Sequence, residues 1–577
     1  MRAAISQLVT AAIASAIEAG ALSLPSPPDP ELERPRDPAH GDWATSVALR
    51  SAKPAGKPPR DVANIIAERI AESPDITSVE VAGPGFINLR LSAAALQRVL
   101  TEARAQGADF GRVDLGHDRR VQVEFVSANP VGPMHVGHGR WAALGDSMAR
   151  VLAHAGWDVQ REFYINDAGV QMDIFAKSVS ARYMQLCGRE VPFPQDGYQG
   201  AYIADIAQEI LDAEGDAWAD TDASSREAHF KETAYAAVLS HLKRVLHGMG
   251  VDFDVWFSER TLHEPLVDVA AEEDKGGPNA IDAAIEALRE AGYVYEHEGA
   301  IWFRSTDFGD DKDRVLEKSD GEYTYFAADI AYHKDKYDRG FDRVINIWGA
   351  DHHGYVKRME AAVAALGYPG QLDIVIGQLV NLFRNGEAVR MSKRTGEMVT
   401  FEDLLDEVGP DAARYFFLRR STDQPLDFDI GLAKEQSAEN PVYYVQYAHA
   451  RICAILRKGV GADTADESVD IAATAASLIR ADAPITLLDS EPELALMRKL
   501  AEFSEVVEIA ARDLAPHKLT RYAEDLAATF HQFYTVCRVV DPAAPELTAA
   551  RLYAVDAARI ALETVLSLAG VSAPQRM

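Results

Sequence analysis

The sequence predicts an α/β fold: a Rossmann-like, doubly wound parallel-sheet core with a small α/β domain before it and an all-α domain after it. Three observations carry this prediction. A strand, a loop, a helix and a second strand follow one another from residue 120, in the order that opens a doubly wound sheet. A helix and a hairpin precede them, and from about residue 436 apolar residues recur at helical spacing. We therefore expect domains at 1–112, 113–435 and 436–577.

The first domain is predicted to begin with an amphipathic helix. Its apolar residues fall at helical spacing, at Ile5, Leu8, Val9, Ile13 and Ile17. Polar residues interrupt the segment, so packing on its own domain is favoured over a targeting role. A Pro-rich connection over 24–41, a helix over 59–73 and a hairpin turning at 83–85 complete the small α/β unit.

The second domain is predicted to open with a strand in VQVEFVSA, followed by a helix in GRWAALGDSMARVLAHAG and a strand in VQREFYI. Residues 180–300 are expected to form mostly polar, acidic helices. A further strand, FDRVINIWGA, precedes another polar loop. The third domain is expected to be helical because it has few strand signals.

Composition and charge limit the class of protein. The chain has 577 residues, with 58 Lys and Arg against 89 Asp and Glu, and a formal net charge of −31. This composition excludes wholesale disorder, a collagen-like fibre and a disulfide scaffold. The charge argues against a protein that holds nucleic acid mainly through a strong positive field. Three scattered cysteines predict reduced thiols in a cytoplasmic protein, and the absence of 18 consecutive apolar residues predicts no membrane span.

A loop between the strand at 120 and the next helix carries the first chemical motif. It runs Ser127-Ala128-Asn129-Pro130-Val131-Gly132-Pro133-Met134-His135-Val136-Gly137-His138. Backbone N–H groups at a helix N-terminus favour an anion such as phosphate, and glycines let a ligand approach closely. The two histidines can donate hydrogen bonds to phosphate oxygens as charge develops. H-x-G-H alone is a weak signal, but two histidines at a strand-to-helix switch favour a functional site.

A second motif, Val389-Arg390-Met391-Ser392-Lys393-Arg394-Thr395-Gly396, forms a local basic segment in an acidic protein. Lys393 could neutralise the charge that grows on a departing pyrophosphate. Taken alone, the segment is better explained as a solvated basic loop.

Together the two motifs resemble the HIGH and KMSKS signatures of class I aminoacyl-tRNA synthetases, and longer segments resemble the arginyl-tRNA synthetase family. These segments occur in order over nearly the whole chain: HGDWATSVAL at 40–49, VAGPGFINLRL at 81–91, FVSANPVGPMHVGHGR at 125–140, FYINDAG at 163–169, WGADHHGYVKR at 348–358, ENPVYYVQYAHAR at 439–451 and the terminal LAGVSAPQRM. Arg390 stands where the signature has its first lysine, so the positive charge is kept.

The resemblance implies an arginine–tRNA ligase with a class I catalytic domain. Arginine's carboxylate would attack the α-phosphate of ATP, bound with Mg²⁺, and tRNA's terminal adenosine would then take the arginyl group through its 2′-hydroxyl. Positioning and charge stabilisation, more than a protein nucleophile, serve this chemistry. The implied catalytic residues are His135, His138, Ser392 and Lys393. The implied ATP-binding residues are Gly137, Gly349, Asp351, His352 and Met391. No protein-bound zinc or other metal is expected.

A bound arginine needs an anion for its guanidinium and polar groups for its α-amino end. The family's Tyr-x-x-x-Asp and S-x-N elements match here, and the implied arginine-binding residues are Ser127, Asn129, His138, Tyr325 and Asp329. The HIGH-type motif itself comprises Ala128, Asn129, Pro130, Gly132, Pro133, His135, Gly137 and His138. Asn166 and Asp167 could line the site or form a turn.

Both flanking domains are implied to contact tRNA, the first at the elbow and the last at the anticodon. Tyr447 and Arg451 are the implied contacts of the helical domain, since aromatic rings stack on splayed bases. A packing stripe formed with Tyr443 is an equally good explanation of these residues. The expected partners are the arginine tRNA, L-arginine and ATP, without a membrane, and the expected state is a monomer.

Three alternatives remain. The main one is another class I synthetase, with glutamyl and cysteinyl types nearest, although a cysteinyl type would need zinc-ligating cysteines. A small-molecule nucleotidyltransferase would share only the H-x-G-H loop and would lack the flanking domains. A non-catalytic tRNA-binding paralogue should have lost the histidines or Lys393, and all are present.

Overall fold

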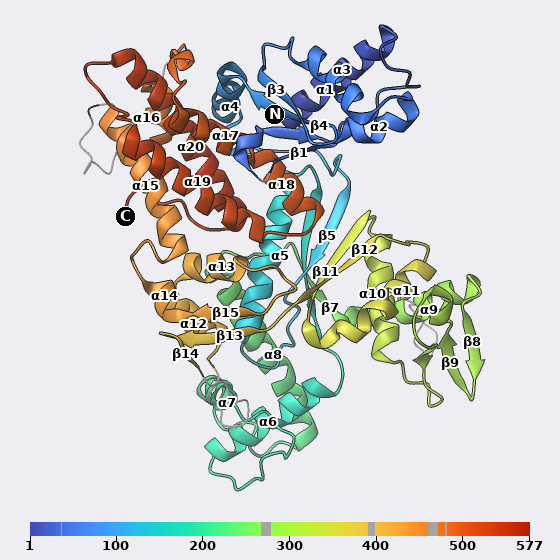
Figure 1. Cartoon of the computed structure of the whole chain (residues 1–577). Coiled ribbons are helices and arrows are strands. Elements are labelled where there is room, and N and C mark those ends of the chain that lie inside the picture. The colour runs from blue at the N-terminus through green and yellow to red at the C-terminus, as the bar shows by residue number, and fades with distance from the viewer. Residues whose placement is uncertain (36, 267–277, 390–398, 460, 462–470, 479–481) are drawn as a thin grey trace.

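A four-stranded antiparallel sheet, in the order β1-β2-β4-β3, organises the N-terminal domain of the computed structural model (Figure 1). The structure describes all residues except 36, 267–277, 390–398, 460, 462–470 and 479–481. The domain's elements are α1 (Arg2–Glu18), β1 (Leu32–Glu33), β2 (Trp43–Thr45), α2 (Val47–Ala55), α3 (Pro59–Ile70), β3 (Ile76–Ala82), β4 (Phe86–Leu91) and α4 (Ala93–Gln106). The predicted first helix and hairpin are confirmed, and Ile5, Val9 and Ile13 are buried.

A five-stranded, wholly parallel sheet forms the centre of the second domain, in the order β12-β11-β5-β6-β7. Its strands are β5 (Arg120–Glu124), β6 (Asp158–Ile165), β7 (Val255–Ser258), β11 (Arg343–Gly349) and β12 (Leu372–Gly377). The helices that connect them include α5 (Val136–His154), α10 (Tyr325–Asp338) and α11 (Val356–Ala365). β5 and β11 are almost continuously buried, as strands covered on both faces are. The predicted doubly wound parallel sheet is confirmed.

Two insertions interrupt this sheet. Between β6 and β7 lie α6 (Val170–Leu186), α7 (Ala201–Glu214) and α8 (Ala223–Gly248). Between β7 and α10 lie α9 (Ala280–Glu290) and an antiparallel sheet of β8 (Val294–His297), β9 (Ala300–Phe303) and β10 (Arg314–Glu317), which protrudes from the body in Figure 1. The expectation of mostly helices over 180–300 therefore missed β7, β8 and β9. These strands are only four residues long, too short for a clear alternating pattern.

The second domain ends in a small sheet and short helices. The elements are β13 (Val380–Arg384), β14 (Glu387–Ala388), α12 (Phe401–Val408), α13 (Pro410–Leu418), β15 (Leu426–Asp429) and α14 (Ile430–Lys434). Of these, β13, α12 and α13 pack on α5. Thr400 caps α12 by accepting a hydrogen bond from the backbone N–H of Asp403. Such a cap satisfies a donor that a helix N-terminus would otherwise leave unpaired.

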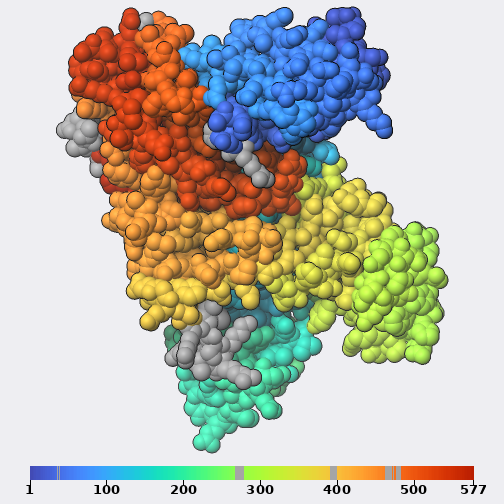
Figure 2. All heavy atoms as spheres, viewed as in Figure 1, coloured from blue at the N-terminus to red at the C-terminus, as the bar shows by residue number. Residues whose placement is uncertain are grey.

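The described part of the C-terminal domain is helical, as predicted. Its helices are α15 (Pro441–Gly459), α16 (Ile471–Leu478), α17 (Glu491–Ala501), α18 (Phe503–Arg512), α19 (His517–Val536) and α20 (Pro545–Ala569). Of these, α17 and α20 pack against α4 of the N-terminal domain, and Arg34 of that domain forms an ion pair with Glu505 at 2.8 Å. Figure 2 shows these two domains side by side at one end of the molecule.

Candidate active site

The candidate site lies at the carboxyl ends of the central parallel strands. The order of the sheet reverses at β5, because β6 and β7 lie to one side of it and β11 and β12 to the other. Ligands of doubly wound sheets bind in the crevice outside such a point. The loop that follows β5 and the loop that follows β11 therefore border the same crevice.

His135 and His138 lie together at the N-terminus of α5, where His135 is the cap. The Nδ1 atom of His135 accepts the backbone N–H of His138 at 3.3 Å, and the Nδ1 atom of His138 accepts that of His135 at 3.2 Å. Their rings stack with 3.7 Å between centroids. Because both Nδ1 atoms accept, these bonds assign the proton of each neutral ring to Nε2, the donor that a phosphate oxygen requires.

Close neighbours explain two glycines of this loop. A Cβ atom at Gly132 would lie 2.7 Å from the Tyr202 hydroxyl, and one at Gly137 would lie 2.9 Å from the His135 ring. Ala128 and Pro130 are buried and Pro133 is half-buried. Asn129 is exposed, and its amide donates to Gln171 Oε1 at 2.9 Å.

The backbone is strained where the loop leaves β5. Val126 and Ser127 have positive φ angles of 69° and 42°, which are unfavourable for residues with a Cβ and most of all for a β-branched one. The Ser127 hydroxyl donates to Glu124 Oε1 at 2.9 Å and accepts the backbone N–H of Tyr164 at 3.2 Å. These two bonds join β5 to β6 and hold the strained segment at the edge of the crevice.

Residues Met391, Ser392 and Lys393 of the second motif lie outside the described residues. The chain that follows them is described. Thr400 forms an antiparallel bridge with His135, and the Phe401 N–H donates to the Met134 carbonyl at 2.9 Å. The C-terminal flank of the second motif is thus attached to the loop of the first.

Arg140 links α5 to the segment after β12 and to the segment before β15. Its buried guanidinium donates to the carbonyls of Gln378, Ser421 and Gln424 at 2.8–2.9 Å. Burial lowers the pKa of Arg140 to about 10, and the three carbonyls take the place of a contacting carboxylate.

The loop after β11 brings three predicted ATP-binding residues to the rim of the crevice. Gly349 ends β11, whereas Asp351 and His352 lie exposed in a 3-10 turn (Ala350–Tyr355) with an ion-pair distance of 3.5 Å. Trp141 of α5 packs beneath them, and a Cβ at Gly349 would lie 3.1 Å from its indole. Trp141 was not among the predicted residues.

Tyr325 and Asp329 occupy the first turns of α10, which Thr324 caps. The Tyr325 side chain is exposed, and its hydroxyl lies near Gly169. Asp329 is half-buried, and its Oδ2 atom accepts the Tyr355 hydroxyl at 2.5 Å. Burial raises the pKa of Asp329 to about 7.

Glu259, which sequence reasoning missed, is a further acid near Asp329. It is buried, it accepts the Tyr164 hydroxyl, and burial raises its pKa to about 7. An acid directly after a strand was the available signal, but β7 had not been predicted. Asp167 is buried, and its carboxylate accepts the Ser258 hydroxyl at 2.7 Å, which ties the loop after β6 to the end of β7.

Tyr447 and Arg451 lie on α15 of the helical domain, away from the crevice. The Tyr443 and Tyr447 rings are nearly parallel, with 6.2 Å between centroids, and the Arg451 guanidinium lies 4.7 Å over Tyr534 of α19. Tyr447 is 39% exposed, so part of this aromatic and basic face is accessible.

Comparisons with known proteins match all three regions. Residues 3–91 match the arginyl tRNA synthetase N terminal domain, 99–209 and 265–424 the catalytic domain of class I (R) tRNA synthetases, and 445–577 the DALR anticodon binding domain. The chain is 50% identical to an arginine–tRNA ligase of Heliobacterium modesticaldum, over 100% of this chain and 99% of that protein. It is 48% identical to one of Geobacillus thermodenitrificans, over 97% and 96%.

The fold is also that of a solved structure. The arginyl-tRNA synthetase of Thermus thermophilus superimposes with a TM-score of 0.71 at 23% identity, over 100% of both chains. None of the helices in the described ranges is long and apolar enough to cross a membrane.

Proposed function

We propose, since the chain belongs to the arginyl-tRNA synthetase family and is an arginine–tRNA ligase that uses ATP, that three groups of residues around the crevice bind different parts of the substrates. The first group holds the phosphates of ATP. His135 and His138 donate from Nε2 to phosphate oxygens at the N-terminus of α5. The stacked, reciprocally capped pair of histidines is the observation that carries this proposal. Ser392 and Lys393, with Met391, stabilise the charge on the same phosphates.

The second group holds the adenosine of ATP. Gly137 and Gly349 let it approach the backbone, and Asp351 accepts from a ribose hydroxyl beside His352. Mg²⁺ enters with ATP as part of the substrate.

The third group holds arginine. Asp329 pairs with the guanidinium, Tyr325 lies along the side chain, and Ser127 and Asn129 contact the α-amino end. His138 also contacts arginine, as a donor from Nε2. A carboxylate is the geometric and electrostatic partner of a guanidinium. The position of Asp329 on the α10 turn nearest the crevice supports this assignment.

The chemistry proceeds in two displacements. An oxygen of arginine's carboxylate forms a bond to the α-phosphorus while the bond to pyrophosphate breaks, and the histidines and Lys393 stabilise the charge that moves onto pyrophosphate. The 2′-hydroxyl of the terminal adenosine of tRNA then forms an ester with the arginyl carbonyl carbon, and AMP leaves. The protein contributes positioning and charge stabilisation to both steps.

The flanking domains hold the tRNA, with Tyr447 and Arg451 at the anticodon and the N-terminal domain at the elbow. The exposed aromatic and basic face of α15 supports this role, because such faces stack on unpaired bases. The enzyme acts as a cytoplasmic monomer.

Two measurements test these assignments. Charging of total tRNA with each of the twenty amino acids and Mg-ATP should yield arginyl-tRNA alone. Asp329→Asn keeps an acceptor for Tyr355 but removes the charge, and it should raise the KM for arginine about 100-fold while the KM for ATP changes little. Asp338→Asn, on the exposed end of the same helix, is the matched control. An unchanged KM for arginine in the Asp329 variant would overturn the guanidinium assignment.

A further inference from the structure

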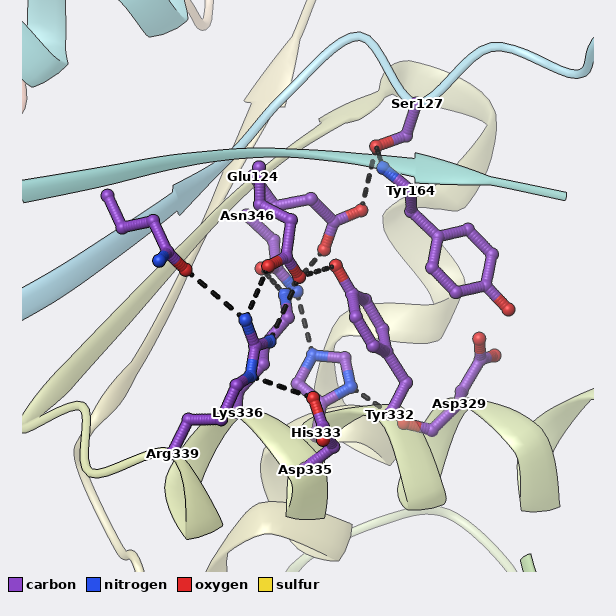
Figure 3. Close-up of polar contacts among 12 residues, drawn as sticks. Glu124, Ser127, Tyr164, Asp329, Tyr332, His333, Asp335, Lys336, Arg339 and Asn346 are labelled. Carbon is purple, nitrogen blue, oxygen red and sulfur yellow. Dashed lines mark hydrogen bonds and ion pairs between the residues drawn. The ribbon is translucent and has the colours of Figure 1, made fainter. Parts of the chain in front are cut away.

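A buried lysine lies beneath the candidate arginine site, on the helix that carries Asp329. The Lys336 side chain is 0% exposed, and its ammonium lies 2.6 Å from Glu124 Oε2, whose side chain is 8% exposed (Figure 3). It also donates to Asn346 Oδ1 at 3.0 Å. Taking such a charge out of water is costly unless it is paired and hydrogen-bonded, and here both conditions are met.

The hydrogen bonds on one side of Lys336 run back to Asp329, and each has a defined direction. The Asp329 carbonyl can only accept, so His333 donates to it from Nδ1 at 2.7 Å. The Nε2 atom of the neutral ring then accepts from the Asn346 amide at 2.8 Å. Burial lowers the pKa of His333 to about 3, in agreement with a neutral ring.

The bonds on the other side reach Ser127. An ionised Glu124 can only accept, so the Ser127 hydroxyl, 2.9 Å from Oε1, must donate its single proton to it. The same oxygen accepts the Tyr164 N–H at 3.2 Å. One lone pair of the Ser127 oxygen is left for any further contact, and Ser127 is partly exposed at the crevice.

We propose that Lys336 is a positioning residue for arginine: by keeping Glu124 an acceptor, it makes Ser127 an acceptor toward the crevice, and so selects the α-ammonium of the substrate. The inference rests on the proposed contact between Ser127 and arginine. An acceptor attracts an ammonium and gains nothing from a ligand that lacks one. Without Lys336, the buried Glu124 carboxyl loses the cation that fixes it as an acceptor, and the Ser127 proton is no longer held toward Glu124 and can turn toward the crevice.

The test compares two ligands of the full-length enzyme, arginine and 5-guanidinopentanoic acid, which is arginine without its α-amino group. Calorimetry or competition gives the dissociation constant of each ligand, and the quantity compared is the ratio of the constant for 5-guanidinopentanoic acid to the constant for arginine. General damage to the pocket weakens the binding of both ligands and leaves this ratio unchanged. Loss of an oriented acceptor weakens the binding of arginine alone and therefore lowers the ratio. Lys336→Met should lower the ratio about tenfold or more, the value of one hydrogen bond to a charged group. Lys334→Met, on the exposed side of α10, should leave it unchanged.

Ser127→Ala and the double variant separate this inference from the proposed function. Ser127→Ala should lower the ratio as Lys336→Met does, and adding Lys336→Met to it should lower the ratio no further. An unchanged ratio in Ser127→Ala would contradict the proposed arginine contact itself. A fall in Ser127→Ala with no fall in Lys336→Met, or additive effects of the two, would overturn the role of Lys336 alone.

Thermal melting shows whether Lys336→Met folds. If it does not fold, a milder variant, Glu124→Asp, tests the role of Lys336. Glu124→Asp keeps the charge that Lys336 needs but shortens the reach to Ser127 by one methylene. We expect it to fold and to lower the ratio. A ratio equal to that of the unmodified enzyme would overturn the inference.

Discussion

Thr400 forms an antiparallel backbone bridge with His135, so the chain that leaves the second motif is attached to the first histidine of the first motif. Phe401, next to this bridge, is fully buried against Gly139, where a Cβ atom would overlap its ring. The two motifs that are proposed to share the phosphates of ATP are therefore joined by the packing of α12 on α5.

Phe401→Ala should loosen this attachment. We expect the free energy of unfolding to fall by about 3–5 kcal/mol and kcat for ATP–pyrophosphate exchange to fall with it, because the flank of the second motif loses its contact with Gly139. Denaturant unfolding and exchange assays with tRNA present measure both quantities. Phe503→Ala, an equally buried ring of the helical domain, is the control. Similar losses of kcat in both variants would show that stability alone explains the effect.

Replacing His135 or His138 by Asn should separate capping from catalysis. At position 135 Asn is a good N-cap, and at position 138, the third residue of α5, its side-chain oxygen can accept the backbone N–H of residue 135 as the imidazole does. The helix should therefore persist in both variants, but the Nε2 donor is lost. We expect each variant to lower kcat for adenylate formation about 10²–10³-fold, as loss of one oriented donor does. The KM for arginine should change little in the His135 variant and should rise in the His138 variant, because His138 is also proposed to contact arginine. The exposed His247→Asn serves as the control in the same single-turnover assay. Retention of full kcat would refute the proposed phosphate contact.

Residues that lie close together in the sequence were predictable from it, whereas relationships between distant segments were not. His135, His138 and Asn129 belong to one loop, which lies between an apolar strand and a helix of 19 residues. Glu259 was missed because β7 is short and its place in the sheet depends on pairing with β6. Lys336 was missed because its partners Glu124 and Asn346 belong to other strands, and only the strand order brings them beneath one helix.

Arginine binding should depend on pH near neutrality. Burial raises the pKa values of Asp329 and Glu259 to about 7, so both acids lose charge as the pH falls through that value. A neutral Asp329 cannot pair with a guanidinium, and kcat/KM for arginine should therefore fall up to about tenfold per pH unit below pH 7. In Asp329→Asn the fall of kcat/KM that comes from protonation of Asp329 should disappear, whereas the Glu259→Gln variant should still show it. A flat profile from pH 5.5 to 8 would contradict the assignment.

The same shift predicts the sign of a stability change in the free enzyme. The folded pKa of Asp329 is raised above its unfolded value near 3.8, so its favourable contribution is complete below that value and is lost as the pH rises through about 7. Asp329→Asn removes the cost of the buried charge. The melting temperature of this variant, relative to the unmodified protein, should therefore be higher at pH 8 than at pH 5. A relative melting temperature that is the same at both pH values would contradict this.

Gly377 and Trp141 should be coupled at the floor of the proposed adenosine site. A Cβ atom at Gly377 would lie 2.6 Å from Trp141 Cδ1 and would overlap the indole nitrogen, so Gly377→Ala must displace the ring. We expect a loss of about 1–3 kcal/mol in the free energy of unfolding, typical of overpacking, and a higher KM for ATP. Gly248→Ala, which meets nothing within 4 Å, should be neutral or stabilising because alanine favours the helix. Trp141→Leu combined with Gly377→Ala should recover much of the lost stability, since the smaller side chain leaves room for the added methyl group. Strictly additive losses in the double variant would show that the two residues do not interact in this way.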